Sequence, residues 1–233
     1  MRMKLISLNV GLPRGVTWHG MNVSTGIFKQ PVNGRVMLRK LNLDGDRQAD
    51  LTVHGGKNKA VYCYPLEHYE YWKKELPGHE LPLGKFGENF TVDVDGDDAR
   101  SQHADLPEHA IHIGDRFSVG SAEVVVTQPR LPCYKLGIRF QMDDMVKRFL
   151  VSGRSGFYLA VTREGEVGVG DEMRPLAQDP NAVPVSAITQ LYIAKQYSRE
   201  DLHTLHRALR VAALPESWKE YFRERLEQVK AEV

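Results

Sequence analysis

The fold is indicated by residues 116–127, which read RFSVGSAEVVVT. Two runs rich in β-branched and aromatic residues, 117–119 and 124–126, flank the dipeptide Gly120-Ser121. A two-residue linker that begins with glycine suits the tight turn of a β-hairpin. This stretch therefore predicts two antiparallel strands, and it indicates a chain built from short strands joined by glycine-containing turns.

Further short β-prone runs occur from the N-terminus to about residue 176. They are residues 4–10, 35–38, 60–64, 89–94 and 157–162. Apolar residues at helical spacing interrupt them twice, at 66–75 and 142–151. Many short strands with few helices are typical of a closed or strongly curved barrel. We therefore expect residues 1–178 to form a mainly β domain, a β-barrel with a few peripheral helices.

The last part of the chain, residues 179–233, has a different pattern. A proline-containing break at 179–184 is followed by three helical patterns without strand signals. Ser198 and Asp201 have the spacing of a capping box at the start of the second pattern, and Pro215 opens the third. We expect a small three-helix domain whose aromatic residues lie in a core or a docking seam, because they have the spacing of a buried face.

The charge of the chain is almost balanced. There are 31 Lys and Arg residues and 30 Asp and Glu residues, for a net charge of +1. This balance gives no electrostatic reason to expect nucleic acid or an acidic membrane as a partner. Residues 1–10 lack the continuous apolar stretch of a signal peptide, and no apolar run is long enough to span a bilayer. We expect a soluble, cytoplasmic protein that acts through local chemistry.

The strongest candidate for chemistry is Cys133, within residues 130–136, Arg-Leu-Pro-Cys-Tyr-Lys-Leu. It lies between Arg130 and Lys135 and directly after Pro132, which restricts the backbone. Only a deprotonated sulfur attacks or binds metal, and neighbouring cations favour that form. The sequence therefore predicts a functional thiol, with the alternative that this cysteine is a small buried apolar residue, as many cysteines outside disulfides are.

The second cysteine, Cys63, differs from the first. It lies in the uncharged, β-prone run 60–64, which predicts a strand in the core. The chain contains 2 cysteines, too few and too far apart for a disulfide framework. We expect both thiols to be reduced.

Three glycine-containing loops carry groups suited to an anion or a heterocycle. A Gly-Gly step lets two backbone N–H groups converge on an anion, and a following lysine adds positive charge. Carboxylate and amide groups at a strand start match the donors and acceptors of a heterocycle, and an arginine before a strand offers another anion contact. Each loop, taken alone, is equally well explained as an ordinary turn. The candidates are His54, Gly55, Gly56, Lys57, Glu88, Asn89 and Arg154.

Several sharper motifs are absent from the sequence. Residues 93–104 begin like a calcium loop but have Asp98 and Ala104 where glycine and glutamate are required. The histidines at 103, 109 and 112 lack the spacing and the cysteines of a zinc site. Residues 165–170 lack the strand-to-helix context of a dinucleotide fingerprint and are predicted to form a hairpin. No phosphate loop of the Walker type and no nucleophile elbow is present.

In combination, three blocks closely resemble the MOSC family, which is named after molybdenum-cofactor sulfurase C-termini. They are residues 44–57, ending in Val-His-Gly-Gly-Lys, residues 86–89, Phe-Gly-Glu-Asn, and residues 128–136 around the cysteine. The order and separation of the blocks match the family. The C-terminal helices are similar to the small domain of its YiiM-type bacterial branch, so the resemblance covers essentially the whole chain.

The resemblance implies a MOSC-type β-barrel that holds the molybdenum cofactor, a phosphate-carrying molybdopterin whose dithiolene sulfurs bind the metal. Cys133 matches the cysteine that adds a further sulfur ligand to molybdenum. At the level of the superfamily, the resemblance also suggests pyridoxal phosphate as a ligand. It implies, by position, anion contacts from Lys57, Arg130, Lys135 and Arg154, backbone approach at Gly55 and Gly56, and polar contacts with the pterin from His54, Glu88 and Asn89.

The YiiM-type branch resembles reductases of N-hydroxylated substrates such as 6-N-hydroxylaminopurine, which detoxify mutagenic base analogues. The resemblance therefore implies a two-electron reduction of N–OH at a cysteine-ligated molybdenum. Two cysteines are too few for an iron–sulfur cluster, and no flavin or nicotinamide fingerprint is present. We therefore expect electrons from a separate flavoprotein or ferredoxin-like reductase. Two alternatives stay open: a non-catalytic cofactor carrier or sulfur-handling module, and a barrel that binds another phosphorylated ligand.

Overall fold

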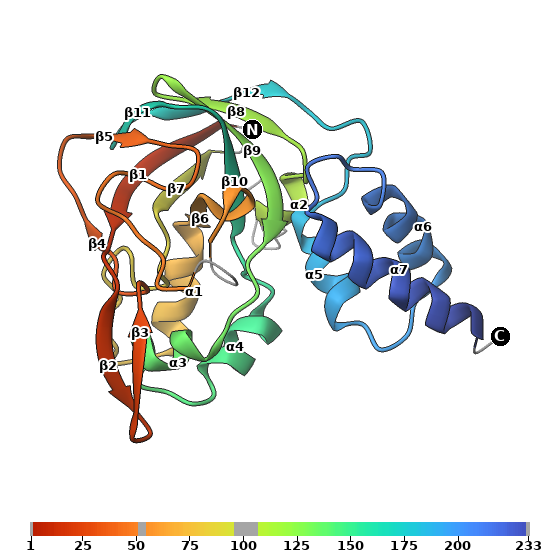
Figure 1. Ribbon diagram of the computed structural model, residues 1–233, viewed down its shortest axis with the longest axis horizontal. Helices are drawn as coiled ribbons and strands as arrows, with labels where there is room; N and C mark the ends of the chain where they lie inside the picture. Colours follow the sequence, from red (N-terminus) through yellow and green to blue (C-terminus); the bar gives the residue numbers. More distant parts are fainter. Residues whose placement is uncertain (1, 51–54, 96–106, 232–233) are drawn as a thin grey trace.

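The computed structural model describes residues 2–50, 55–95 and 107–231, and its main feature is a closed β-barrel (Figure 1). Seven strands follow the order β12-β8-β9-β10-β6-β7-β1, and β12 closes the ring by pairing with β1. All neighbouring strands are antiparallel except β6 and β7, which run parallel. The predicted mainly β fold is confirmed. The strands are β1 (Arg2–Val10), β6 (Val61–Pro65), β7 (Phe90–Asp95), β8 (Arg116–Val119), β9 (Ala122–Pro129), β10 (Phe157–Arg163) and β12 (Glu172–Ala177).

The hairpin predicted within residues 116–127 is present as β8 and β9. Val119 pairs with Ala122, which leaves a two-residue turn that contains Gly120. Gly120 has a φ of 55°, in the left-handed region that favours glycine. A Cβ atom at this position would lie 2.2 Å from the carbonyl oxygen of Glu166. Both the turn and the close approach of a neighbouring segment therefore require glycine here.

Additional strands extend the barrel (Figure 1). β2 (Arg14–Trp18) and β3 (Met21–Thr25) form a hairpin that projects from it, and β4 (Gln30–Pro31) pairs with the end of β1. β5 (Arg35–Leu38) pairs with β11 (Gly165–Gly168). The prediction of a hairpin within residues 165–170 is therefore wrong. Turn residues mark where a chain reverses, but only the folded barrel selects the strand with which β11 pairs.

Four helices and one 3-10 turn accompany the barrel: η1 (Lys57–Lys59), α1 (Glu67–Glu75), α2 (Pro107–Ala110), α3 (Tyr134–Phe140) and α4 (Met145–Ser152). The spacing of apolar residues predicted α1 and α4 but not α3. Helix α4 begins at Met145, three residues later than predicted. Gly137 lies inside α3 and lowers its intrinsic helix propensity. A Cβ atom at this position would lie 2.8 Å from the backbone oxygen of Met142, so tertiary packing rather than propensity explains this helix.

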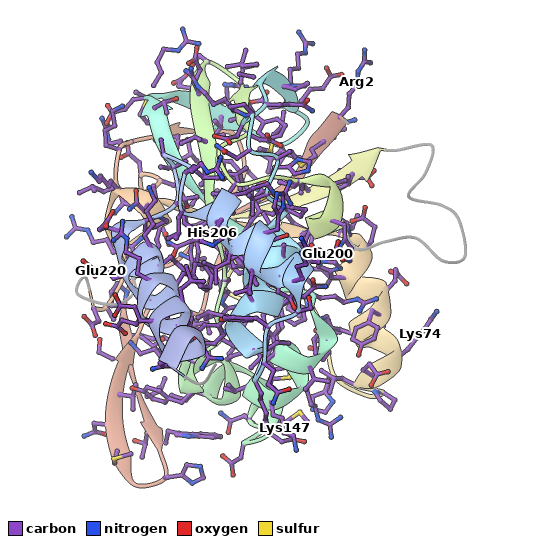
Figure 2. The ribbon with its side chains drawn as sticks, turned by 90° about the vertical axis from the view of Figure 1, so that its right-hand side faces the viewer. Arg2, Lys74, Lys147, Glu200, His206 and Glu220 are labelled. Atoms are coloured by element: carbon purple, nitrogen blue, oxygen red, sulfur yellow. The ribbon has the colours of Figure 1, made fainter. Side chains whose placement is uncertain are left out.

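The C-terminal domain consists of α5 (Val185–Ile193), α6 (Arg199–Ala208) and α7 (Glu216–Ala231), as predicted. The capping box is confirmed, because the Asp201 amide donates to Ser198 Oγ at 3.1 Å and the Ser198 amide donates to Asp201 Oδ2 at 2.8 Å. Figure 2 shows these helices facing the viewer, with Glu200, His206 and Glu220 on their exposed surface.

The three helices pack directly against the barrel. The amide of Val185 donates to the Ile111 oxygen at 2.9 Å, and Trp218 Nε1 donates to Gln128 Oε1 at 2.6 Å. Buried apolar residues of the helices, such as Phe222, belong to the same hydrophobic cluster as the interior of the barrel. The predicted boundary at residue 179 falls between β12 and α5. The hydrophobic core, however, continues from the barrel into the three-helix domain.

Cys63 is fully buried in β6, which confirms the predicted core strand. Within the described ranges, no helix has the length and apolar character needed to cross a membrane. The calcium-like residues 96–104, which include His103, lie outside the described residues. Among the residues that are described, no three histidine, cysteine or acidic side chains are grouped as metal ligands.

Candidate active site

Cys133 lies where strand β9 gives way to helix α3. It precedes the first residue of α3 with an extended backbone, φ −124° and ψ 172°. Pro132 restricts the residue before it and cannot extend β9 by donating a hydrogen bond. The Cys133 side chain is partly exposed, whereas Leu136 and Phe140 of α3 are buried. The apolar face of α3 therefore anchors the segment and leaves the thiol accessible.

A cavity lined by residues of the barrel domain opens beside Cys133, and we call it the barrel cavity. Its empty volume is about 650 Å³, including open solvent at its mouth. Among the described residues, no carboxylate belongs to its lining. The cations in the lining are Lys29, Arg47, Lys59, Arg130 and Lys135. This concentration of positive charge attracts an anionic ligand.

Arg130 is buried and held by aromatic and backbone groups. Its Nη1 donates to the Phe86 oxygen at 2.8 Å and to the Tyr62 hydroxyl at 3.4 Å. Its guanidinium carbon lies 4.7 Å from the Tyr62 ring centre and 5.2 Å from that of Phe149, a favourable arrangement for a cation. Burial opposes the charge, but interactions with Tyr62 and Tyr158 raise the pKa of Arg130. Its other N–H groups have no acceptor among the described residues, so they can bind a ligand.

Lys29 and Asn89 are fixed at the cavity wall by a buried polar network. Lys29 forms an ion pair with Asp46, which also accepts hydrogen bonds from the Gly11 amide and from Asn89 Nδ2, both at 2.9 Å. Asn89 Oδ1 in turn accepts from the Tyr62 amide at 3.1 Å. Burial lowers the pKa of Lys29, and attraction to Asp46 opposes this effect. These contacts fix the orientation of the Lys29 and Asn89 side chains.

Lys59 and Tyr158 interact electrostatically with Cys133. Partial burial lowers the pKa of Lys59, although attraction to Cys133 acts in the opposite direction. Burial raises the pKa of Tyr158, so its hydroxyl keeps its proton at neutral pH. A ligand bound at the sulfur would therefore lie near a lysine ammonium group and a hydroxyl that can donate a hydrogen bond.

A second cavity lies between the barrel and the three-helix domain, and we call it the interdomain cavity. Its empty volume, including open solvent at its mouth, is about 930 Å³. Tyr192 of α5 and Trp218 and Tyr221 of α7 contribute to its lining. Cys133 lines both cavities. The residues that line both cavities are Lys59, Leu131, Cys133 and Tyr158.

The structure brings together part of the predicted site. Asn89 and the segment that carries Arg130, Cys133 and Lys135 lie about 40 positions apart in the chain, yet all four residues line the barrel cavity. Their predicted contacts with a cofactor remain predictions.

Glu88 is fully buried and does not line either cavity. Its carboxylate accepts hydrogen bonds from the Tyr69 hydroxyl, from the Gly84 amide at 2.8 Å and from the Phe86 amide at 3.1 Å. Burial raises its pKa. This carboxylate therefore closes its own loop, and the loop in turn positions the neighbouring Asn89.

The remaining predicted groups lie elsewhere. Gly55, Gly56 and Lys57 are not part of either lining, but Gly56, with a φ of 92°, directs the chain into η1, which carries Lys59 to both cavities. Arg154 lies 3.8 Å from the ring centre of Tyr71, outside both linings. His54 lies outside the described residues.

Several lining residues were not found by sequence analysis. Arg47 lies within the first of the three blocks and Lys59 lies just after it, so their position in or next to this block could have marked them as candidates. Lys29 and Tyr158 had no such signal, because strand pairing and burial, rather than a local motif, bring them to the cavity.

The donor set at Cys133 suits a metal that arrives with ligands of its own. The described residues contain no cluster of three or more protein ligands, so a metal here would have a single protein sulfur. An organic cofactor that chelates its metal and carries a phosphate would supply the other ligands and place negative charge against Arg130 and Lys135. The residues present fit such a group.

Two protein families match the chain. The MOSC domain matches residues 50–174, and the YiiM-like, 3-alpha helix domain matches residues 183–229. The first match covers the site segments from the Gly-Gly step to the cysteine. The second covers α5, α6 and most of α7.

Individual proteins are similar over almost the whole length. YflK of Bacillus subtilis (strain 168) is 38% identical over 95% of this chain and 93% of its own, and YiiM of Escherichia coli (strain K12) is 35% identical over 83% and 81%. The crystal structure of YiiM from Geobacillus stearothermophilus gives a TM-score of 0.75 at 30% identity, covering 96% of this chain and 99% of that one.

A shorter match concerns a longer protein. A Gibberella moniliformis protein named Reductase is 30% identical over 155 residues, which are 65% of this chain and 26% of that protein. The family matches and the full-length similarities agree with the closed barrel and its helical extension. The chain therefore belongs to the MOSC family, in the group of YiiM-like proteins that carry a C-terminal three-helix domain.

Proposed function

We propose that this protein is a molybdenum-cofactor-dependent oxidoreductase that reduces N-hydroxylated compounds such as 6-N-hydroxylaminopurine. One observation carries the proposal: Cys133 lines both a cationic cavity and a second, weakly charged cavity. This arrangement suits a cofactor bound on one side and a substrate that approaches from the other. Membership of the MOSC family and similarity to a protein named Reductase support an oxidoreductase.

The proposed cofactor contacts follow from the barrel cavity. Cys133 would give its thiolate to the metal. Arg130 and Lys135 would bind the phosphate, because Arg130 has N–H groups without an acceptor among the described residues. Gln48 would pair with the pterin edge, whereas Asn89, whose amide is engaged by Asp46 and by the Tyr62 amide, would hold the cavity wall in place. When bound, the molybdenum cofactor supplies the two-electron chemistry that the side chains lack.

The overall reaction balances as R–NHOH with two electrons and two protons giving R–NH₂ and water. The protein side chains bind and orient the reactants and hold protons. Tyr158 lines both cavities, and burial raises its pKa, so its Oη carries a proton beside Cys133 at neutral pH. We propose that the electrons come from a separate flavoprotein or ferredoxin-like reductase, because the two cysteines of this chain cannot ligate an iron–sulfur cluster.

The test compares wild type with Cys133→Ala, both purified from a host that makes the cofactor. Molybdenum per chain is measured by elemental analysis, and 6-N-hydroxylaminopurine reduction is measured with a chemical electron donor. We expect the variant to lose metal and turnover together, with turnover falling by at least about 100-fold, the upper range for supporting groups of a metal site. The matched control is Cys63→Ala, which changes a buried cysteine of β6 and should keep the metal.

Other outcomes discriminate between functions. Full turnover in Cys133→Ala would refute the proposed role of this residue. Metal without turnover in wild type would indicate a cofactor carrier, and absence of metal from both proteins would refute the cofactor assignment.

A further inference from the structure

The interdomain cavity differs from the barrel cavity in having an aromatic wall. The rings of Tyr192 and Trp218 have centres 5.6 Å apart in an edge-to-face arrangement, and those of Tyr192 and Tyr221 are 5.4 Å apart. Tyr192 is 37% exposed, so its ring is accessible to a ligand. The aromatic residues were predicted to lie in a core or a docking seam; Phe222 is buried in the core and Trp218 bonds to Gln128 of the barrel, while Tyr192 and Tyr221 also face a cavity.

This wall is held in place by contacts with the barrel and within the domain. Trp218 Nε1 donates to Gln128 Oε1 at 2.6 Å, and Gln128 Nε2 donates to the Asn58 oxygen at 3.3 Å. The Tyr221 hydroxyl donates to the Tyr192 oxygen at 3.3 Å. Gln128 thus has both ends of its amide engaged, and the aromatic rings have defined neighbours. A wall that is ordered in this way costs little entropy when a ligand binds.

The lining of the interdomain cavity carries little charge. Lys59 is its one cation and no carboxylate lines it, within the described residues. The Ser217 hydroxyl makes no hydrogen bond to another described side chain or backbone group, so it can pair with a polar edge. Aromatic side chains bind planar rings by stacking and edge contacts, and this interaction tolerates any base because every base has a π-face. A neutral, planar heterocycle therefore matches this cavity better than a small aliphatic molecule does.

We infer that the three-helix domain selects the substrate: Tyr192 and Tyr221 hold the ring of a planar heteroaromatic N-hydroxylated compound, with its N–OH group toward the Cys133 wall. This inference rests on the proposed function and adds the residues that determine specificity. It assigns the barrel domain to the cofactor and the appended helices to recognition of the substrate.

The experiment uses full-length protein from a cofactor-making host. Tyr192→Leu/Tyr221→Leu removes both rings, Tyr192→Phe/Tyr221→Phe keeps them, and Tyr197→Leu alters a tyrosine of the same domain that does not line the cavity. Two quantities are measured. The first is the ratio of kcat/KM for 6-N-hydroxylaminopurine to that for hydroxylamine, and the second is the Kd of adenine by calorimetry.

We expect the double leucine variant to lower the kcat/KM ratio by about tenfold, mainly because the KM for 6-N-hydroxylaminopurine rises. The Kd of adenine should also rise by about tenfold. The double phenylalanine variant should restore both quantities to within about twofold, because the stacking surface is kept. An intact ratio and Kd in the double leucine variant, or no adenine binding by wild type, would overturn the inference. Adenine binding that depends on the rings in a protein without reductase activity would refute the proposed function and leave the recognition site standing.

Discussion

The barrel cavity and the interdomain cavity share a wall but have different chemical characters. Five cations line the first, whereas Lys59 is the one cation of the second among the described residues. The second instead has aromatic side chains from α5 and α7. The barrel cavity is formed within one domain, while the interdomain cavity requires both domains.

Under the proposed function, this difference would separate recognition of the cofactor from recognition of the substrate. The cations that would bind an anionic cofactor lie in the segments covered by the MOSC match and in the preceding residues of the same domain. The aromatic groups that would bind a substrate ring lie in the separately matched helical domain. Under the proposed function, changes in the helices would alter substrate preference while cofactor binding stayed the same.

The largest effect is expected at the buried ion pair of the barrel cavity. Lys29→Met would leave the Asp46 carboxylate buried without its cation, so the free energy of unfolding should fall by about 3–5 kcal/mol. Denaturant unfolding measures this change. Lys29→Met/Asp46→Asn should recover much of the loss, because no unpaired charge remains; equal stability of wild type and Lys29→Met would contradict the structure of this wall.

A smaller effect is expected where the barrel supports the helical domain. Glu108 of α2 accepts hydrogen bonds from His68 Nε2 at 2.8 Å and from the Gly156 amide at 2.7 Å, and the adjacent His109 contacts Ser186 of α5 at 2.9 Å. Burial opposes the charge of Glu108, but His68 and the Gly156 amide together lower its pKa.

Because this pKa lies below that of the unfolded chain, about 4.3, the carboxylate stabilises the fold at neutral pH, and this stabilisation is lost as the pH falls through the lowered pKa. Glu108→Gln should reduce the free energy of unfolding at pH 7 by about 1–3 kcal/mol. Its stability should also vary less than that of wild type between about pH 5 and pH 3. Parallel pH profiles of the two proteins would count against the assignment, and denaturant unfolding at each pH provides the measurement.

The smallest effects are expected for two lysine substitutions that test whether the two cavities bind different ligands. Lys135→Met changes a residue of the barrel cavity alone, whereas Lys59→Met changes one that lines both. Each should weaken cofactor retention by about tenfold, because Lys135→Met loses a charge-assisted contact with the phosphate and Lys59→Met loses the positive charge near Cys133. Molybdenum content after dialysis measures retention, and calorimetry measures adenine binding. Adenine binding should change with Lys59→Met only; the same change in both variants would mean that the cavities are not distinct sites.

Much of the fold was predictable from local pattern. Two β-prone runs on either side of Gly120-Ser121 predicted the hairpin of β8 and β9, and helical spacing predicted α5, α6 and α7. The pairing of β5 with β11 was not predictable, because it joins segments with no shared local signal. Helix α3 was missed for a related reason: its internal Gly137 is unfavourable for an isolated helix and is required by the approach of Met142.

The candidate site also has a part that was predictable from local sequence and a part that was not. The charge and proline pattern around Cys133 marked it as a candidate thiol, and Arg130, Lys135 and Asn89 do line the cavity beside it. Glu88 lay in a correctly chosen loop, but hydrogen bonds within that loop engage its carboxylate. Sequence proximity identifies the segment that reaches a site, whereas the side-chain direction depends on packing.

The sequence by itself determined the short strands, the three helices after residue 179 and the charged surroundings of the Cys133 thiol, because each depends on neighbours within a few positions. Only the tertiary structure decided that Lys29 and Tyr158 join that cysteine, and that Tyr192, Trp218 and Tyr221 face a cavity beside it. These groups are distant in the chain, and they meet because burying one continuous apolar core closes the barrel and packs the helices against it.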